Sequence, residues 1–434
     1  MPESPPLRRR DLAPLRHLPR SVTRNYLRQA RDLPPGAAPR RGIRGFLGAT
    51  LPAAIAAYAR ERLGPRHRFA DYGPGSGDSG LYRLDGDGNS VRVSLAGDWA
   101  SGTDEAAAVA AAIGRFHPHF TVHLGDAYYV GDESEIRATF LGERTGPYEP
   151  TLWPLGSAGS FALNGNHEMY ARGRAYFDVL LPRLGLAAGP PQRASFFCLE
   201  NAHWRIIALD TAYNSVAWPL LEELPFWPFT ASNDLPAAEL RWLGHNVRPG
   251  ADERGIVILT HHSPYRPRGH DCSRIARQLR WHVRRPVLWF FGHEHRLAVY
   301  DRHDCGAGLE VWGRNIGHAG MPVEAATPLA DPALRLRFTD ARRYRNDEGL
   351  ELGYNGYANL TFTGPTLSIE YRDLNGAGVY REQWRTAGGA LEALDPTFSG
   401  PSDALEPEHL DRSAAGRGGG AGGTADERIR RGEH

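Results

Sequence analysis

Short apolar segments alternate with polar or helix-forming segments along most of the chain. Segments rich in Val, Ile, Leu and Phe predict buried strands, and several of them end directly at Gly-Asp, Gly-Asn-His or paired His residues. The predicted strands are 91–95, 120–124, 161–163, 195–199, 204–209, 256–259 and 287–291, followed by 297–300, 309–312, 334–338, 358–362 and 367–371. Helical segments separate the earlier strands, which predicts a layered α/β fold whose sheet the later strands complete.

Two helices are predicted between these strands. Thr103 precedes an Ala-rich segment and its side-chain oxygen can cap a helix that continues to about residue 114. A second helix is predicted over 236–246. Ligands bind where strands end in open α/β sheets, so the polar residues that follow the strands are the candidate functional groups.

Composition divides the chain into four parts. Residues 1–42 are rich in Arg and Pro and predict an extended arm, and residues 43–89 predict a helical or linker extension. The main domain is assigned to residues 90–385. Residues 386–434 are dominated by Gly, Ala and charged side chains, which bury too little apolar surface to offset the entropy of ordering, so a disordered tail is predicted.

Charge and hydropathy argue against two classes of partner. The 434 residues carry 51 basic and 50 acidic side chains, a net charge of +1, which is not typical of a protein that binds nucleic acid over its whole surface. No apolar stretch reaches the ~20 residues of a membrane-spanning helix. Neither nucleic acid nor a membrane is therefore predicted as a partner, and the oligomeric state is left open.

The cysteines and the N-terminal region indicate in which cellular compartment the protein is expected. Cys198, Cys272 and Cys305 are widely spaced and form neither a zinc ribbon nor a dense disulfide framework, which favours the cytoplasm. The alternative is export, because Arg40-Arg41 precede an apolar segment, 46–59, that ends in a small-x-small sequence. That segment contains a proline, and we interpret it as an amphipathic helix packed on the main domain.

Polar clusters at five strand ends carry the candidate chemistry. They are Gly97-Asp98, Gly125-Asp126, Gly165-Asn166-His167, His261-His262 and Gly292-His293-Glu294-His295. Alternate residues of an extended segment face the same side, so His293 and His295 can address one region. Five such clusters in one chain predict a shared site.

In this order the clusters resemble the calcineurin-like metallophosphoesterase superfamily over about residues 90–300. Asp98 lacks the His two positions later that most members have, and Tyr129 stands three positions after Asp126. Both features resemble the purple acid phosphatase branch. The resemblance implies a two-sheet sandwich flanked by helices, with a dinuclear metal site at the C-terminal ends of the strands.

The resemblance also implies the ligands. One metal would bind Asp98, Tyr129 and His295, the other would bind Asn166, His262 and His293, and Asp126 would bridge them. Carboxylate and phenolate oxygens favour Fe³⁺ at the first position, whereas imidazole and amide groups suit Zn²⁺, Fe²⁺ or Mn²⁺ at the second. Tyr128 lies one position too early and is expected to pack in the protein.

Three neighbouring residues receive roles outside the ligand set. His167 is implied as the proton donor to the leaving oxygen. His262-Ser263-Pro264 matches the His-x-Pro block of the family, so His261 is expected to point to the opposite face, behind the ligands or in contact with substrate. Glu168 either orients His167 or lies on the surface.

The implied activity is hydrolysis of a small phosphomonoester through in-line attack by a metal-bridging hydroxide. The same metal core also serves phosphodiesterases that cleave cyclic nucleotides or phospholipid headgroups. A non-catalytic scaffold is the third alternative, and the filled ligand positions disfavour it.

Overall fold

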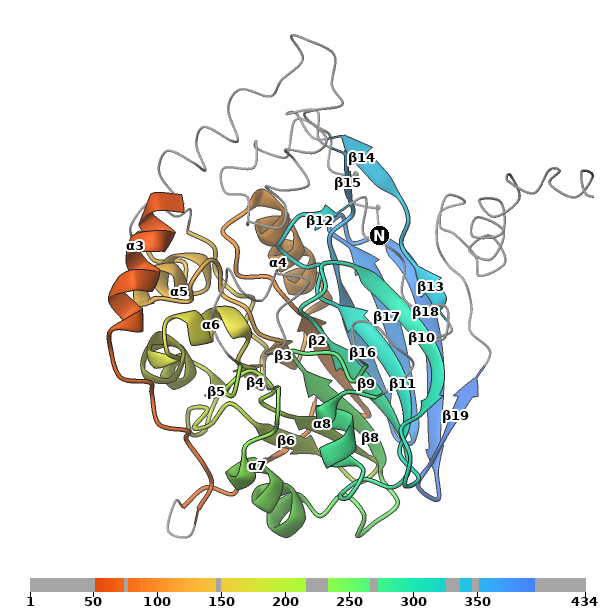
Figure 1. Ribbon diagram of the computed structural model, residues 1–434. Coiled ribbons are helices and arrows are strands. Elements are labelled where there is room, and N and C mark those ends of the chain that lie inside the picture. The colour runs from red at the N-terminus through yellow and green to blue at the C-terminus, as the bar shows by residue number, and fades with distance from the viewer. Residues whose placement is uncertain are drawn as a thin grey trace, which may run out of the picture.

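The computed structural model describes residues 51–73, 77–86, 88–145, 150–215, 233–265, 272–324, 336–345 and 351–394. Two eight-stranded sheets pack face to face, and helices cover their outer faces (Figure 1). The predicted α/β sandwich is confirmed. The predicted N-terminal arm, residues 1–42, lies outside the described residues.

The first sheet contains most of the middle of the chain. In spatial order it comprises β1 (Leu81–Arg83), β6 (Phe197–Glu200), β7 (Trp204–Ala208), β8 (Gly255–Thr260), β9 (Pro286–Phe291), β11 (Glu310–Ile316), β10 (Leu297–Asp304) and β13 (Leu336–Thr339). Strands β7, β8, β9 and β11 are parallel, so the carboxyl ends of β8 and β9 lie at the same edge.

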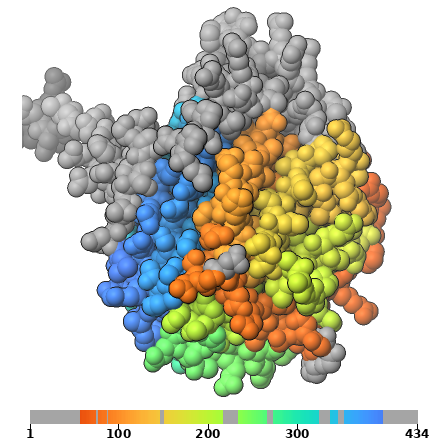
Figure 2. Space-filling view, turned by 180° about the vertical axis from the view of Figure 1, so that it is seen from behind, coloured from red at the N-terminus to blue at the C-terminus, as the bar shows by residue number. Residues whose placement is uncertain are grey.

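The second sheet joins distant parts of the chain. Its spatial order is β19 (Ala390–Leu394), β18 (Gly378–Ala387), β17 (Thr366–Asp373), β16 (Gly356–Thr363), β2 (Ser90–Ala96), β3 (Phe120–His123), β4 (Gly159–Ala162) and β5 (Gly185–Leu186). Strand β2 lies between β3, its parallel neighbour, and β16, its antiparallel neighbour. Figure 2 shows the result from behind, with the blue C-terminal strands beside orange segments from the first third of the chain.

Helices and a small third sheet complete the described structure. The helices are α3 (Leu51–Arg62), α4 (Asp104–Phe116), α5 (Glu133–Thr139), α6 (Asn166–Tyr170), η2 (Tyr176–Leu180), η3 (Leu181–Arg183), α7 (Ala237–Trp242), η4 (Leu243–Val247) and α8 (Arg274–Leu279). The third sheet has the order β12 (Val323–Glu324), β15 (Glu351–Gly353) and β14 (Arg343–Arg345). No helix among the described residues is long and apolar enough to cross a membrane.

Buried apolar side chains hold the layers together. The core between the sheets includes Val93 and Val122 from one sheet and Val257 and Phe290 from the other. Helix α4 starts as predicted, because the Thr103 side chain accepts a hydrogen bond from Ala106 N, and its apolar face packs on the outside of the second sheet. Helices α7 and α8 cover the first sheet in the same way. This burial is the main favourable contribution to folding.

Two predicted domain boundaries are wrong at their edges. Strand β1 lies within the predicted extension 43–89 but pairs with β6, so it belongs to the main sheet. Strand β18 continues to Ala387 and β19 pairs with it, so the ordered structure extends past the predicted start of the tail at residue 386. A disulfide joins Cys272 to Cys305, which is one bond and not the dense disulfide framework that the spacing of the cysteines argued against.

Candidate metal centre

The predicted ligands come together at one end of the sandwich. Asp98 follows β2, Asp126 follows β3, and Asn166 begins α6 directly after β4. The histidine pair follows β8, and His293 follows β9. Both large sheets therefore contribute to one site, as the five strand ends predicted.

The backbone at three of these positions is unusual. Asp98, Asp126 and His293 have φ angles of 59°, 73° and 69°, in the left-handed region that side chains other than Gly rarely adopt. Such conformations cost free energy and are retained where a site requires them. Each one lets the chain turn sharply at the end of a strand, so that a side chain from the strand end faces the neighbouring loops.

One donor set surrounds the hydroxyl of Tyr128. This oxygen lies 2.6 Å from Asp98 Oδ1, 3.1 Å from Asp126 Oδ2 and 2.9 Å from His295 Nε2. His295 Nε2 lies 3.5 Å from Asp98 Oδ1. The other carboxylate oxygen of Asp98 accepts a hydrogen bond from His293 N at 2.7 Å, which orients the carboxylate.

The tyrosine hydroxyl in this set is that of Tyr128 and not that of Tyr129, the predicted ligand. Residues after Asp126 pair with the loop after β2, because Tyr128 N donates to Ala100 O and Ala127 forms a parallel bridge with Ala100. This pairing turns the Tyr128 side chain toward the carboxylates. Tyr128 and Tyr129 both belong to a cluster that includes Met169, but the hydroxyl that lies against the carboxylates is that of Tyr128.

A second donor set lies on the other side of Asp126. Asn166 Oδ1 lies 3.0 Å from His261 Nε2 and 3.1 Å from His293 Nδ1. His261 Nε2 lies 3.4 Å from Asp126 Oδ1. Asn166 Nδ2 donates to the Tyr170 hydroxyl at 3.0 Å, so the amide oxygen is the atom that faces the other donors. Asp126 thus contributes one oxygen to each set, as expected of a bridging ligand.

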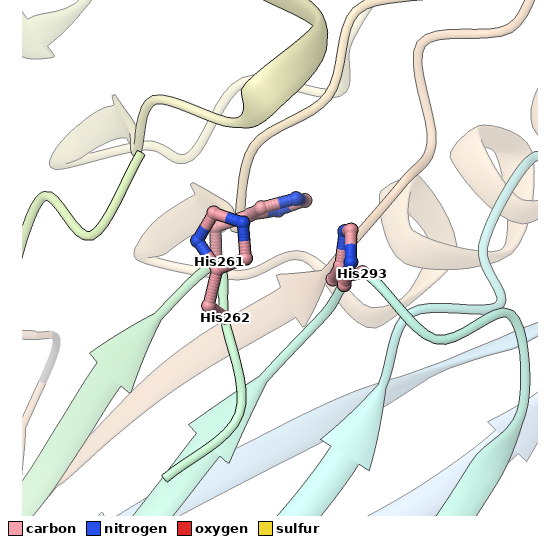
Figure 3. Close-up of side chains that lie close together, drawn as sticks. All are labelled: His261, His262 and His293. Atoms are coloured by element: carbon pink, nitrogen blue, oxygen red, sulfur yellow. The ribbon is translucent and has the colours of Figure 1, made fainter. Parts of the chain in front are cut away.

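Both histidines of the pair belong to this region, which corrects the expectation that His261 points away. His261, His262 and His293 offer ring nitrogens within 4.8 Å of one another, and Figure 3 shows the three rings grouped beyond β8 and β9. Strand β8 ends at Thr260, so the alternation of faces along a strand does not extend to the pair.

Two hydrogen bonds select the nitrogen that each imidazole of the pair presents. His261 Nδ1 lies 2.9 Å from Leu124 O, and this carbonyl can only accept, so Nδ1 donates to it and Nε2 is the nitrogen that faces Asn166 and Asp126. His262 Nδ1 lies 3.0 Å from the Thr211 hydroxyl oxygen, which also accepts a hydrogen bond from His262 N. Thr211 was missed in the sequence, although it directly follows the polar end of β7.

The donor atoms are spaced as metal ligands are. Atoms bonded to one cation at about 2.0–2.2 Å must lie roughly 3 Å apart from their neighbours. The separations of 2.6–3.5 Å within the two sets agree with that spacing. The residues present therefore fit two cations that share Asp126.

The electrostatics of the buried centre also favour cations. Burial alone would raise the pKa of the Asp126 carboxyl, but His261 and His167 outweigh it and hold that pKa well below its ordinary range. Burial lowers the pKa of His293 to about 4, and it also lowers the pKa of His262 well below its ordinary value. His262 and His293 are therefore neutral near pH 7, which is the form that binds metal, whereas Asp126 outweighs burial at His261 and raises its pKa to about 10, so a metal bound there would have to displace a proton.

His167 stands beside both donor sets. Its Nδ1 lies 2.7 Å from Tyr129 O, so Nδ1 donates to this carbonyl and Nε2 faces the site, 3.8 Å from Asp126 Oδ2. The imidazole is partly exposed, with 21% of its side-chain surface accessible. It can therefore reach both solvent and a substrate bound at the centre.

Glu168 holds the loops of the site rather than His167. It is fully buried, and its carboxylate accepts hydrogen bonds from the backbone N–H groups of Asp126, Ala127 and Gly165 at 2.8–3.1 Å. The surface alternative for Glu168 is therefore excluded. Asp210, left outside the predicted ligand set, has a similar structural role, because it accepts from Ser195 Oγ and from two backbone N–H groups of its own loop.

The sequence model of the calcineurin-like phosphoesterase family matches residues 91–297. This span contains both donor sets and His167. The chain contains a calcineurin-like phosphoesterase domain. The superfamily predicted from the five clusters is thus confirmed, and the sequence match carries the assignment. No curated protein sequence matches the chain.

Solved structures similar to the phosphoesterase domain and its surroundings share little sequence with it. The structure of PhoD is 11% identical with a TM-score of 0.42, and the match covers 76% of this chain and 78% of PhoD. A purple acid phosphatase, PPD1 from yellow lupin (Lupinus luteus) seeds, is 12% identical with a TM-score of 0.40, covering 68% and 52%. GAP50, the anchor in the inner membrane complex of Plasmodium, is 13% identical with a TM-score of 0.39, covering 76% and 95%.

Proposed function

We propose that the protein is a dinuclear metal-dependent phosphatase that hydrolyses small phosphomonoesters, in the manner of the purple acid phosphatase branch. The observation that supports this most directly is the pair of donor sets that share Asp126, with His167 next to them. A single structural metal site would need neither the shared carboxylate nor a partly exposed imidazole beside it.

The donor chemistry supports unlike metals at the two positions. Tyr128, Asp98 and Asp126 offer hard oxygen donors, which suit Fe³⁺, whereas the imidazoles and the Asn166 amide suit Zn²⁺, Fe²⁺ or Mn²⁺. When bound, such a pair supplies Lewis-acid stabilisation of charge on the phosphoryl oxygens and an acidified water.

The side chains around the centre provide the remaining chemistry. His167 Nε2 faces the site with Nδ1 fixed by the Tyr129 carbonyl, so its protonated form can donate a proton to the leaving oxygen from Nε2. Glu168 fixes the loop that carries Asp126, and Tyr170 fixes the Asn166 amide. These contacts preorganise the donors before a substrate arrives.

The test combines metal analysis with substrate comparison on the full chain. We expect two metal ions per chain, and faster turnover of p-nitrophenyl phosphate than of bis(p-nitrophenyl) phosphate. Asn166→Ala should lose metal at the second position and most activity, whereas the exposed carboxylate variant Asp85→Asn should keep both. Faster diester cleavage would establish the phosphodiesterase alternative, and no turnover of either ester by metal-replete protein would establish the scaffold. Cytoplasmic localisation stays a prediction.

A further inference from the structure

The adjacent imidazoles of His261 and His262 have different hydrogen-bond partners. Both residues follow β8, and each offers a ring nitrogen within 4.8 Å of a ring nitrogen of His293. The ring centroids of the pair are 4.8 Å apart, and the ring planes are nearly perpendicular, at 84°. Figure 3 shows the two rings beside each other, with His293 next to them. Proximity alone therefore does not decide which of the two binds a cation, but their hydrogen bonds distinguish them.

The hydrogen bonds of His261 are those of a metal-binding imidazole. Its Nδ1 donates to Leu124 O at 2.9 Å, and its Nε2 lies 3.0 Å from Asn166 Oδ1 and 3.4 Å from Asp126 Oδ1. An imidazole that binds metal usually donates its other N–H to a backbone carbonyl, a carboxylate or water, which fixes the ring. His261 is therefore oriented with Nε2 toward the two oxygens of the second donor set.

The ring of His262 contacts a hydroxyl group instead of a carbonyl. Thr211 is fully buried, and its Oγ1 accepts a hydrogen bond from His262 N at 3.0 Å and lies 3.0 Å from His262 Nδ1. Within the described part of the chain, Thr211 Oγ1 has no further hydrogen-bond partner. A buried hydroxyl proton without an acceptor costs free energy, so the Thr211 hydroxyl donates to His262 Nδ1.

This hydrogen bond makes the other ring nitrogen of His262 a donor. When Nδ1 accepts from Thr211, a neutral imidazole carries its proton on Nε2. A nitrogen that binds a metal must offer a lone pair and not a proton. No acceptor among the described residues is paired with His262 Nε2, and the side chain keeps 5% exposure whereas His261 keeps none. His262 Nε2 is therefore suited to an oxygen acceptor from a bound molecule.

Asp210 holds Thr211 in position. The Asp210 carboxylate accepts from two backbone N–H groups of its own loop at 2.8 and 2.9 Å and from Asn164 Nδ2 at 3.2 Å. Asn164 lies two residues before Asn166. The loop that carries Thr211 is thus fixed to the loop that carries Asn166, which makes Thr211 a positioning residue for the His262 ring.

We propose that His261 is the member of the pair that binds the second metal, whereas His262 donates a hydrogen bond from Nε2 to an oxygen of the substrate phosphoryl group. This inference rests on the proposed phosphatase function. A hydrogen bond spans about 3 Å, so a ring within 4.8 Å of the neighbouring imidazole nitrogens can reach a phosphoryl group held at the centre. A hydrogen bond to a charged oxygen is stronger than one between neutral groups.

Metal binding separates the roles of the two histidines. Calorimetric titration of metal-free protein with Mn²⁺ should show two sites in the unaltered protein and in His262→Ala, but one site in His261→Ala. Loss of a site from His262→Ala would overturn the assignment. A measurement without substitution supports or contradicts it independently: nuclear magnetic resonance of ¹⁵N-labelled histidine in metal-free protein should show the Nε2–H tautomer at His262, and the Nδ1–H tautomer there would overturn the role of Thr211 and the donor role of His262.

Phosphate binding tests the second half of the proposal. Calorimetry of metal-replete protein with inorganic phosphate should show about tenfold weaker binding to His262→Ala, and His262→Gln should recover part of the loss because its amide can still donate. Thr211→Val should also weaken binding, whereas Thr211→Ser should not. The matched control is Thr139→Val, because the Thr139 hydroxyl is equally buried but donates to Glu135 O in α5, and it should bind phosphate as the unaltered protein does.

The outcomes distinguish this inference from the proposed function. Unchanged phosphate affinity in His262→Ala would overturn the contact between His262 and the phosphoryl group, whatever the turnover. If the unaltered protein hydrolyses neither p-nitrophenyl phosphate nor its diester but the phosphate-binding difference is retained, the phosphatase function alone is overturned.

Discussion

The phenol of Tyr128 links the two carboxylates and the outermost histidine of the centre. Burial raises the pKa of this phenol well above its ordinary value, and the carboxylates of Asp98 and Asp126 raise it further, so the phenol keeps its proton in metal-free protein. A metal that binds the oxygen must displace that proton. Metal uptake at the first position should therefore strengthen as the pH rises.

Substitution of the two adjacent tyrosines distinguishes their roles. A phenolate bound to Fe³⁺ gives a visible charge-transfer band, so we expect iron-replete protein to be coloured and Tyr128→Phe to lose the band. Tyr129→Phe is the matched control and should keep it, because the hydroxyl among the donors is that of Tyr128. Absorbance spectra of the three proteins test this, and a band that survives Tyr128→Phe but disappears in Tyr129→Phe would reverse the assignment.

Loss of His167 should affect proton transfer more than metal binding. We expect His167→Ala to retain both metals and to lower kcat by roughly 10²–10⁴-fold for alkyl phosphates, whose leaving oxygens need a proton. Aryl phosphates with acidic leaving groups should lose much less. Steady-state kinetics over a series of leaving groups, with metal content as the control, measure this; a uniform loss over the series would argue against a proton donor at this position.

For single residues, the sequence predicts which ones lie at the centre better than it predicts the direction of their side chains. Asp98, Asp126 and Asn166 were identified because each stands at a strand end, where position alone decides the outcome. The choices between Tyr128 and Tyr129, and between His261 and His262, depend on backbone turns outside the strands. Those turns are set by contacts between loops, such as the hydrogen bond from Tyr128 N to Ala100 O. The spacing of residues within one motif does not predict such contacts.

At the scale of elements, helix α4 carries a buried acid toward the third sheet. Glu105 in its first turn is buried, and the Tyr344 hydroxyl donates to its carboxylate at 3.2 Å. Burial raises the pKa of Glu105 to about 7, against the hydrogen bonds that favour the charged form. The folded protein therefore holds this proton at pH values where an unfolded chain has lost it.

Stability should respond to pH through this residue. Between about pH 4.5 and 7 the unfolded chain binds less of this proton than the folded protein, so the free energy of unfolding falls as the pH rises, by about 3 kcal/mol from this group. Glu105→Gln cannot titrate and should show a correspondingly smaller fall. Denaturant unfolding of both proteins at several pH values measures the difference, and parallel pH profiles would contradict it.

Most strands could be predicted from the sequence because they are short, apolar and bounded by turn residues, as β8 and β9 are. Seven strands were missed, namely β1, β5, β12, β14, β15, β18 and β19, and the first and last of them lack that pattern. Strand β1 has three residues, and none of the five residues of β19 is buried. Strand β1 is held in place by pairing with β6, which is distant in the chain, and β19 is held by its hairpin with β18. A local sequence pattern reports neither pairing.

At the scale of the whole molecule, a buried ion pair joins the two sheets. Arg314 of β11 donates through Nε and Nη2 to the carboxylate of Glu382 in β18 at 2.7 and 2.8 Å, and the Tyr371 hydroxyl donates to the same carboxylate at 2.7 Å. Both charged side chains are buried. Each charge therefore depends on the other for compensation.

Removal of one partner should cost more than removal of both. Arg314→Met leaves an unpaired buried carboxylate, so we expect it to lower the free energy of unfolding by about 3–5 kcal/mol. The double variant Arg314→Met/Glu382→Leu should recover much of that loss, because no buried charge remains. Denaturant unfolding of the single and double variants forms the cycle that measures the coupling. Additive losses would show that the pair contributes little as a unit.

The position of β2 between β3 and β16 has a consequence for synthesis of the chain. Asp98 follows β2, yet the antiparallel neighbour of β2, Gly356–Thr363, lies more than two hundred residues later in the sequence. During translation one edge of β2 therefore stays without its neighbour until most of the chain has left the ribosome. An unpaired strand edge can pair with strands of other chains, so a cell that makes this protein must protect that edge in the meantime.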